Sequence, residues 1–228
     1  MENKGGVTIP RWALAVAAAV VALLVLLVIV LIPRGGDNST TSAAGGSNGA
    51  AQSKATSTVA AGTCGAGASD DQAVLGAAPK DTTWVTTDAG WTGPVSKAAG
   101  PKANSPIRNC FEHSAEGALY ASVWATIEIN EAPEAYMPTV VGPGAEVARQ
   151  NRQGDTKTRT VVRVAGYRYV SYTPERATVR LLFQIPSGAY RSWDVVMEWH
   201  DGDWRYWAPT TAPGISNVDP DDFITWEA

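Results

Sequence analysis

The stretch that decides the fold is Ser114–Asn130, SAEGALYASVWATIEIN. Ser114 is a favoured residue for a helix N-cap, and Glu116 lies in the first turn, where the helix dipole favours a carboxylate. Apolar side chains then occupy most of the circumference of the predicted helix. In a water-soluble domain such a helix must be surrounded. We therefore expect a strongly curved sheet on one side of it and a second covering element on the other.

The segments that follow supply this sheet. Four of them have the alternation or the β-branched and aromatic content of strands: Val161–Thr173, Arg176–Ile185, Tyr190–His200 and Trp204–Trp207. Asp201-Gly202 between the last two is a strong signal for a tight hairpin. The side chains expected on the inner face are Val179, Leu181, Phe183, Val195 and Met197, and His200 is expected to face outward.

The fold class predicted from these segments is α+β, over residues 114–228. Its helices come first, with a short additional helix at Ala145–Gln153, and pack in the curved antiparallel sheet. Before this domain, residues 79–113 carry repeated proline and glycine, which predicts an extended arm. The arm contains Trp84 and Trp91, which we expect to be pinned onto the surface of the domain. Packing is the commoner use of isolated tryptophans, and binding of a peptide or a glycan is the alternative.

The N-terminal part of the chain contains a long apolar stretch at residues 12–32, WALAVAAAVVALLVLLVIVLI. At about 1.5 Å per residue, a helix of this length covers the roughly 30 Å hydrocarbon core of a bilayer. We therefore predict a single transmembrane helix. Lys4 and Arg11 precede it, which favours residues 1–11 in the cytoplasm and the C-terminal domain outside the cell membrane. A cleaved signal peptide is the alternative, although its apolar region is normally shorter.

Residues 33–78 are rich in Gly, Ser, Thr and Ala, a composition that predicts a disordered linker. Cys64 in this linker and Cys110 in the arm are the two cysteines of the chain. Outside the cytoplasm we expect a disulfide between them, which would stabilise the fold by about 4 kcal/mol through loop closure. Half a zinc site, or a nucleophile and its base, at Cys110 and His113 are alternatives without supporting motifs. We predict no catalytic residue, metal or cofactor.

Charge patterning bears on possible partners. The net charge is −4 and no region combines a large basic excess with phosphate-gripping patterns, so direct binding of nucleic acid is not expected. Basic residues dominate residues 149–180, whereas carboxylates dominate from Asp194 onward. Cross-strand ion pairs on the solvated face would explain this split. The alternative is a surface that docks a protein partner. The candidate interaction residues are Trp84, Trp91, Arg163, Arg168 and Arg180.

Helices followed by a curved meander that ends in WHDGDWRY, residues 199–206, resemble the nuclear-transport-factor-two-like cone fold. With an anchor and a linker added, the arrangement is similar to scaffold subunits of bacterial type IV secretion and conjugation systems. The residues Phe111–Ser114, the helix start Gly117–Leu119 and the closing Phe223–Trp226 also resemble an uncharacterised family of anchored proteins of high-GC Gram-positive bacteria. These resemblances imply a non-catalytic structural role. Enzymes of the cone fold place Asp, His or Tyr inside, and here Tyr120 is the one polar ring expected there.

Two functions are expected from different classes. The first is a non-catalytic scaffold or protein-interaction component of a cell-envelope assembly, with a conjugative or type IV secretion apparatus as one candidate. Its partners would be the membrane, through residues 12–32, and envelope proteins or a second copy of the chain. The alternative is a small-molecule or cell-wall binding domain, or a cone-fold enzyme. A cavity with a buried carboxylate or tyrosine facing an aromatic wall would favour this alternative, and a cone filled by Leu181, Phe183 and Trp199 would count against it.

Overall fold

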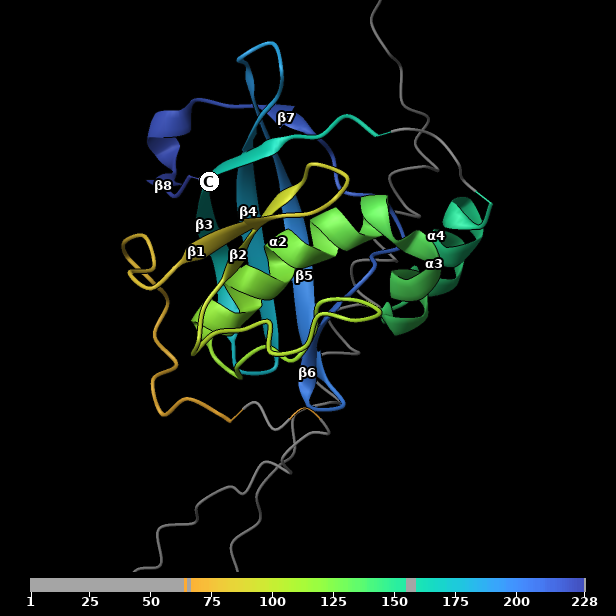
Figure 1. The fold of residues 1–228 in the computed structure, drawn as a ribbon, viewed down its shortest axis with the longest axis horizontal. Helices are drawn as coiled ribbons and strands as arrows, with labels where there is room; N and C mark the ends of the chain where they lie inside the picture. Colours follow the sequence, from red (N-terminus) through yellow and green to blue (C-terminus); the bar gives the residue numbers. More distant parts are fainter. Residues whose placement is uncertain (1–63, 65–66, 155–158, 228) are drawn as a thin grey trace, which may run out of the picture. The chain divides into compact units, whose positions relative to one another are not determined.

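A computed structural model describes Cys64, residues 67–154 and residues 159–227. These residues form an α+β domain in which one long helix lies against the inner face of a curved antiparallel sheet, as Figure 1 shows. The predicted cytoplasmic N-terminus, the predicted span at residues 12–32 and most of the predicted linker lie outside the described residues. Within the described part of the chain, no helix is both long enough and apolar enough to cross a bilayer.

The main sheet has the strand order β6-β5-β4-β3-β8, and β7 pairs with β5. Its strands are β3 (Arg163–Thr173), β4 (Arg176–Gln184), β5 (Tyr190–His200), β6 (Asp203–Tyr206), β7 (Ser216–Asn217) and β8 (Ile224–Thr225), and all their pairs are antiparallel. Asp201 and Gly202 have φ angles of 50° and 79°, as a tight hairpin with two left-handed residues requires. The predicted meander is confirmed.

Two irregularities in β3 explain the curvature. The register with β4 shifts between Val164 and Gly166 and again between Tyr169 and Ser171. Such bulges bend a strand and reset which side chains face inward. Tyr167 and Tyr169 therefore lie opposite Leu181 and Val179 on the inner face, and Tyr172, three residues further on, returns to the same face opposite Ala177. A simple alternation would have placed Tyr172 outside.

Helix α2 (Ala115–Glu131) begins and ends as its sequence predicts. The Ser114 hydroxyl accepts a hydrogen bond from the Gly117 N–H at 3.0 Å, and Pro133 follows its end. Every residue from Gly117 to Glu128 is buried, which confirms that the helix is enclosed on all sides. The sheet covers one side. A hairpin of β1 (Thr83–Thr86) and β2 (Thr92–Val95) covers another.

The segment predicted as an extended arm contains this hairpin, and it packs more deeply than onto the domain surface. Gly93 of β2 lies so close to α2 that a Cβ there would be 2.5 Å from the Trp124 ring. Trp91 is 5% exposed and Trp84 contacts the ring of Trp226 at 4.8 Å, so both tryptophans pack into the domain. The arm is part of the core because α2 is apolar on the side that the sheet leaves uncovered.

The last part of the predicted linker also contacts the domain. Gln72 donates a hydrogen bond to the His113 carbonyl at 2.8 Å and accepts one from the Tyr172 hydroxyl. The Tyr167 hydroxyl donates to the Ala77 carbonyl at 2.8 Å. Residues 67–78 are thus held by polar contacts with groups far away in sequence, which composition alone does not reveal.

Three short helical segments follow α2: α3 (Pro133–Tyr136), the 3-10 helix η1 (Met137–Thr139) and α4 (Ala145–Arg152), the last as predicted; a further 3-10 helix, η2 (Pro220–Asp222), precedes β8. The expected inward side chains Val179, Leu181, Phe183, Val195 and Met197 are all buried, and His200 is exposed beside Asp201. The inner face of β4 is therefore apolar and buried, as predicted.

Aromatic rings fill much of the interior. Successive ring contacts with centroid distances of 4.8 to 6.3 Å join Trp84, Trp226, Tyr167, Tyr169, Tyr172, Trp204 and Trp199, which we call the aromatic row. Tyr120 of α2 contacts Trp226 at 5.4 Å and exchanges a 2.6 Å hydrogen bond with Thr82. Tyr120 is inside as expected, and it is accompanied by three further tyrosines from β3.

Candidate functional site

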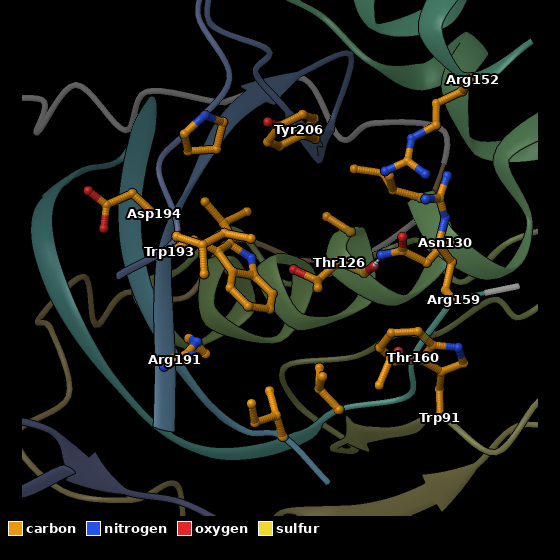
Figure 2. A pocket seen from close by; sticks show the side chains of 17 residues that line it. Trp91, Thr126, Asn130, Arg152, Arg159, Thr160, Arg191, Trp193, Asp194 and Tyr206 are labelled. Atoms are coloured by element: carbon orange, nitrogen blue, oxygen red, sulfur yellow. Dashed lines mark hydrogen bonds between the residues drawn. The ribbon is translucent and has the colours of Figure 1, made fainter. Parts of the chain in front are cut away.

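A pocket of about 470 Å³ lies between the C-terminal half of α2 and the inner face of β5, and Figure 2 shows it from close by. This size is within the range of small-molecule sites. Its lining comes from α2, α4, β5, β6, the β1–β2 and β4–β5 turns and the segments before β3 and β7: Trp91, Ala125, Thr126, Ile129, Asn130, Arg152, Arg159, Thr160, Val162, Ile185, Arg191, Trp193, Asp194, Val195, Tyr206, Pro213 and Ile215. Most of these side chains are apolar.

Trp193 of β5 forms the central wall. It pairs across the sheet with the buried Leu181, which places its ring on the inner face, and Figure 2 shows the indole in the middle of the pocket. The ring stacks on Phe183 with a centroid distance of 3.9 Å and an interplanar angle of 10°. This stacking fixes one face of the indole. Trp91, at the hairpin turn, lines the pocket from the other side.

Arg191 is an exception to the apolar character of the inner face. It lies opposite Phe183 in the register of β4 and β5, so it belongs to the same face as Trp193, Val195 and Met197. Among the described residues it forms no ion pair, and its guanidinium reaches only the Tyr190 carbonyl, at 3.5 Å. A cation thus lines the pocket without a carboxylate partner in the described part of the chain.

Two further arginines reach the pocket from the opposite side. Arg152 comes from the end of α4 and Arg159 from the segment before β3, and in Figure 2 both lie on the same side of the pocket as Asn130 of α2. The Asn130 amide donates a 2.7 Å hydrogen bond to the Thr126 carbonyl, which holds it at the end of the helix. The polar groups of the pocket are thus concentrated at its margins, around an apolar centre.

Asp194 lines the pocket with its main chain rather than its carboxylate. It pairs with Arg180 across the sheet, on the outer face, and Figure 2 shows its side chain directed away from the indole of Trp193. Arg180 binds both carboxylate oxygens, at 2.6 and 2.8 Å. The carboxylate is therefore neutralised outside the pocket.

The titratable groups at the pocket do not form an acid–base pair. Burial raises the pKa of the Tyr206 phenol, and the charge of Arg152 only partly opposes this shift. The phenol is therefore neutral at physiological pH and acts as a hydrogen-bond donor or acceptor. The arrangement of the described lining residues suits binding of a molecule with an apolar body, held between rings and aliphatic side chains, and polar groups at its ends.

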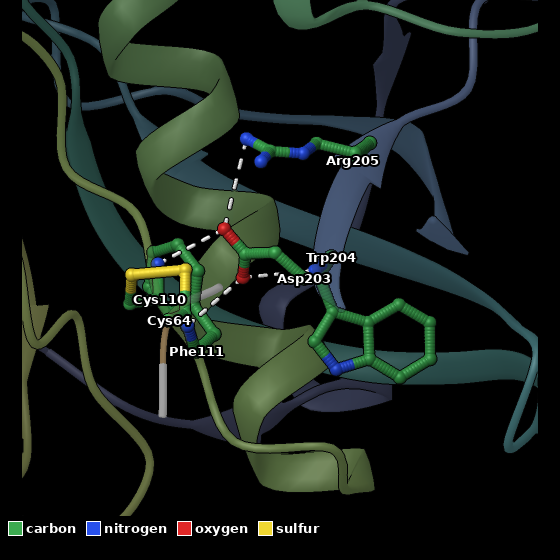
Figure 3. Close-up of a disulfide and its surroundings, with 6 residues drawn as sticks. All are labelled: Cys64, Cys110, Phe111, Asp203, Trp204 and Arg205. Carbon is green, nitrogen blue, oxygen red and sulfur yellow. Dashed lines mark hydrogen bonds and ion pairs between the residues drawn. A yellow bond between two sulfur atoms is a disulfide. The ribbon is translucent and has the colours of Figure 1, made fainter. Parts of the chain in front are cut away.

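A second cluster joins the start of the domain to its final hairpin, as Figure 3 shows. The expected disulfide between Cys64 and Cys110 is confirmed, with a Cα–Cα distance of 5.1 Å. Asp203 is fully buried beside it and accepts hydrogen bonds from the N–H groups of Cys110, Phe111 and Trp204, each at 2.9 Å. Burial raises the pKa of this carboxyl, and the three N–H donors and Arg205 oppose the shift. We call this cluster the clasp.

The clasp also bears on the alternatives at Cys110 and His113. The disulfide leaves neither sulfur available as a nucleophile or a metal ligand. The His113 ring stacks on Trp199 with a centroid distance of 4.0 Å, and its Nε2 lies 2.7 Å from the Pro174 carbonyl. Within the described residues, no group of three or more His, Cys, Asp or Glu side chains is placed to hold a metal ion. His113 therefore serves packing.

The five predicted interaction residues do not form one surface. Arg168 and Arg180 are neighbours on the outer face of the sheet, and Arg163 lies on the same face beside Gln184. Trp91 lines the pocket, on the inner side, and Trp84 belongs to the aromatic row. Ion pairs join β4 to β5 between Arg180 and Asp194 and between Arg176 and Glu198. The expectation of cross-strand pairing is confirmed for these residues.

Sequence reasoning did not single out Arg191 or Asp203. A signal for Arg191 was present: it occupies the apolar phase of β5, in step with Trp193, Val195 and Met197. A charged residue in that phase is unusual and marks a position to examine. Asp203 had no comparable signal, because its role depends on the N–H groups of Cys110 and Phe111, about ninety residues earlier.

Comparison with known proteins yields one match. Residues 44–222 match a family described as a domain of unknown function (DUF8175). No curated protein and no solved structure matches the chain.

Proposed function

The chain belongs to the DUF8175 family, and we propose that it is an anchored, non-catalytic binding protein whose α+β domain holds a small organic molecule outside the cell membrane. The observation that carries this proposal is the pocket between α2 and β5, with Trp91 and Trp193 in its walls and arginines at its margins. Stacked and apolar walls bind the body of a ligand, and a few polar groups orient it.

The location rests on two features. Residues 12–32 have the length and composition of a membrane span, and the basic residues before them favour a cytoplasmic N-terminus. The disulfide of the clasp supports an oxidising compartment for the domain, because such bonds are rare in the cytoplasm.

The location is tested by labelling in intact cells. A cysteine replaces Val170, which is 52% exposed on β3, and the cells are treated with a maleimide that cannot cross membranes. We expect Val170→Cys to react and the matched control Asn3→Cys, before the apolar stretch, to remain unlabelled. Labelling of Asn3→Cys alone would reverse the proposed orientation.

The non-catalytic character is supported by the described pocket residues. The ionisable side chains directed into it are arginines and the phenol of Tyr206, whereas the carboxylate of Asp194 is bound by Arg180 on the other face. Acid–base catalysis needs a group with a pKa near the working pH. Arginine does not provide one, and burial moves Tyr206 further from neutrality.

Ligand binding is tested with neutral probes and the full-length protein in lipid nanodiscs. One- and two-ring aromatic amides, benzamide and 2-naphthamide among them, are screened by ligand-observed NMR. Val162→Trp introduces an indole into the pocket wall, and Val170→Trp makes the same change at an exposed position. We expect the wild type and Val170→Trp to bind and Val162→Trp not to bind. Absence of binding to the wild type, or equal binding to Val162→Trp, would overturn the proposal.

A second candidate is a scaffold in a cell-envelope assembly, such as a secretion or conjugation apparatus. The observation in its favour is apolar exposure around the pocket, where Val161 is 36% and Ile215 is 69% exposed. Exposed apolar groups beside a concave site are typical of protein contacts. A photoreactive phenylalanine analogue at Ile215 in native membranes should then form adducts with an envelope protein or a second copy, and one at Asp219 should not. A lack of protein adducts from Ile215 would exclude this role for the pocket rim.

A further inference from the structure

The position of Arg191 narrows the kind of molecule that the pocket binds. On β5 the inner face otherwise carries Trp193, Val195 and Met197, and the residue opposite Arg191 is the buried Phe183. A guanidinium on an apolar face is costly to desolvate unless an anion pairs with it. In the described part of the chain Arg191 has no such anion, and its one hydrogen bond, at 3.5 Å to the adjacent Tyr190 carbonyl, is weak.

The nearest carboxylate on the same strand cannot fill this role. Asp194 lies on the opposite face, because three positions separate it from Arg191 and side chains alternate along a strand. Arg180 already engages both of its oxygens. The inner face of β5 therefore presents a positive charge that the sheet itself does not balance.

An apolar surface for the rest of a ligand lies directly beside this charge. Trp193 is two residues from Arg191 on the same face, and its ring is held in place by stacking on Phe183. Ile129 of α2 and Val162 line the pocket around it. A volume of about 470 Å³ accommodates one or two rings or a short aliphatic chain.

We propose that the pocket selects organic anions: Arg191 pairs with a carboxylate or a similar anionic group, and the apolar body of the ligand lies against Trp193. This inference rests on the proposed function as a binding domain and adds the charge of the ligand. Guanidinium and carboxylate form bidentate, charge-assisted hydrogen bonds, which are stronger than neutral ones. Arg191 is then the residue that determines specificity, and Trp193 contributes affinity for neutral and anionic ligands alike.

The test compares two probes of the same shape. The anion 2-naphthoate and the neutral 2-naphthamide are titrated into full-length protein in lipid nanodiscs by isothermal calorimetry, with empty nanodiscs as the blank. Wild-type protein should bind 2-naphthoate about tenfold more tightly than 2-naphthamide, a difference of about 1.4 kcal/mol. The preference should decrease with rising salt concentration, because salt screens a partly exposed charge pair.

Arg191→Gln is the decisive variant, and Arg168→Gln is its control on the outer face. Arg191→Gln should bind both probes equally, with the affinity for 2-naphthamide changed less than threefold, and Arg168→Gln should behave as the wild type. Circular dichroism of each variant checks that the fold is retained. Equal affinity of the wild type for the two probes, or an unchanged preference in Arg191→Gln, would overturn the selection of anions while leaving the binding function standing. Failure of both probes to bind the wild type would overturn both proposals.

Discussion

The two halves of α2 lie against the same sheet but face different interiors. In the N-terminal half, Tyr120 packs against Trp226, whose ring also contacts Tyr167, and these buried side chains fill the space. In the C-terminal half, Ile129 and Asn130 face a pocket of about 470 Å³. The backbone architecture is shared, so the side chains on the inner strands decide which half is filled and which is open.

The difference originates in β3 and β5. Two bulges direct three tyrosines of β3 inward, and each finds a hydrogen-bond partner for its hydroxyl, as buried phenols require: Ala77, Ala115 and Gln72. On β5 the inner-face residues Trp193 and Arg191 border the pocket instead. We expect substitutions in the filled half to affect stability and substitutions at the pocket to affect binding.

The largest expected effect is that of Tyr167→Ala in the filled half. Tyr167 is fully buried, and its hydroxyl donates to the Ala77 carbonyl. Removing the ring leaves a cavity and frees residues near Ala77, so the free energy of unfolding should fall by about 3–5 kcal/mol. Urea unfolding of the full-length protein, followed by tryptophan fluorescence, measures this. Tyr190→Ala, at a half-buried tyrosine of β5, is the control and should lose much less.

Removing the disulfide of the clasp should have the next largest effect. Replacing Cys64 and Cys110 by serine should lower the free energy of unfolding by about 2–4 kcal/mol, because the unfolded chain regains the freedom of a loop between residues 46 positions apart. The change should appear as a lower urea midpoint. Reduction of the wild type with dithiothreitol should lower the midpoint equally. An unchanged midpoint in both cases would mean that Asp203 and its hydrogen bonds hold the clasp without the disulfide.

At the pocket, Trp193→Ala should abolish ligand binding while lowering stability only moderately. Trp193 is only half-buried, so the loss of stability should be about 1–2 kcal/mol, below that expected for a fully buried tryptophan. Binding of 2-naphthamide should nevertheless be lost, because the indole forms the central wall. Calorimetry and urea unfolding on the same sample measure both quantities. A loss of stability as large as that of Tyr167→Ala would show that the two halves are not distinct.

The smallest effect at neutral pH is expected for Tyr120→Phe. The hydroxyl exchanges a 2.6 Å hydrogen bond with Thr82, so its loss should cost about 1 kcal/mol. At alkaline pH this difference in stability between Tyr120→Phe and the wild type should narrow. Burial raises the pKa of Tyr120 from 10 to about 12. A raised pKa in the folded state means that stability is complete below pH 10 and is lost as the pH rises toward 12. Urea midpoints between pH 9 and 12 should therefore decline less in Tyr120→Phe than in the wild type.

The sequence predicted those features of the fold that depend on local order. The cap at Ser114, the proline after α2 and the Asp201-Gly202 turn each act within a few residues, and the helices and hairpins appear where they indicate. The alternation in β4 likewise identified its buried face. Packing was predicted as the role of the arm tryptophans, but the depth to which Trp91 is buried was not, because it depends on contacts with α2, which no local pattern records.

The candidate site was less predictable, since its parts are far apart in the chain. Trp91, Ile129 and Trp193 come from a hairpin turn, a helix and a strand, and only their packing creates the pocket. Arg191 was detectable as a cation in the apolar phase of β5, but its surroundings were not. The clasp is similar: the two cysteines predicted a disulfide, whereas the partner groups of Asp203 became evident only in three dimensions.

What the sequence by itself determined is the order of elements and the polarity of their faces, because caps, turns and alternation are set by neighbouring residues. What only the tertiary structure decided is how the interior is divided between a filled half and an open one. The bulges of β3 rotate Tyr172 inward, and the register of β4 and β5 places Arg191 beside a pocket rather than in water. Both depend on pairing between strands, where a shift of one residue moves a side chain to the other face.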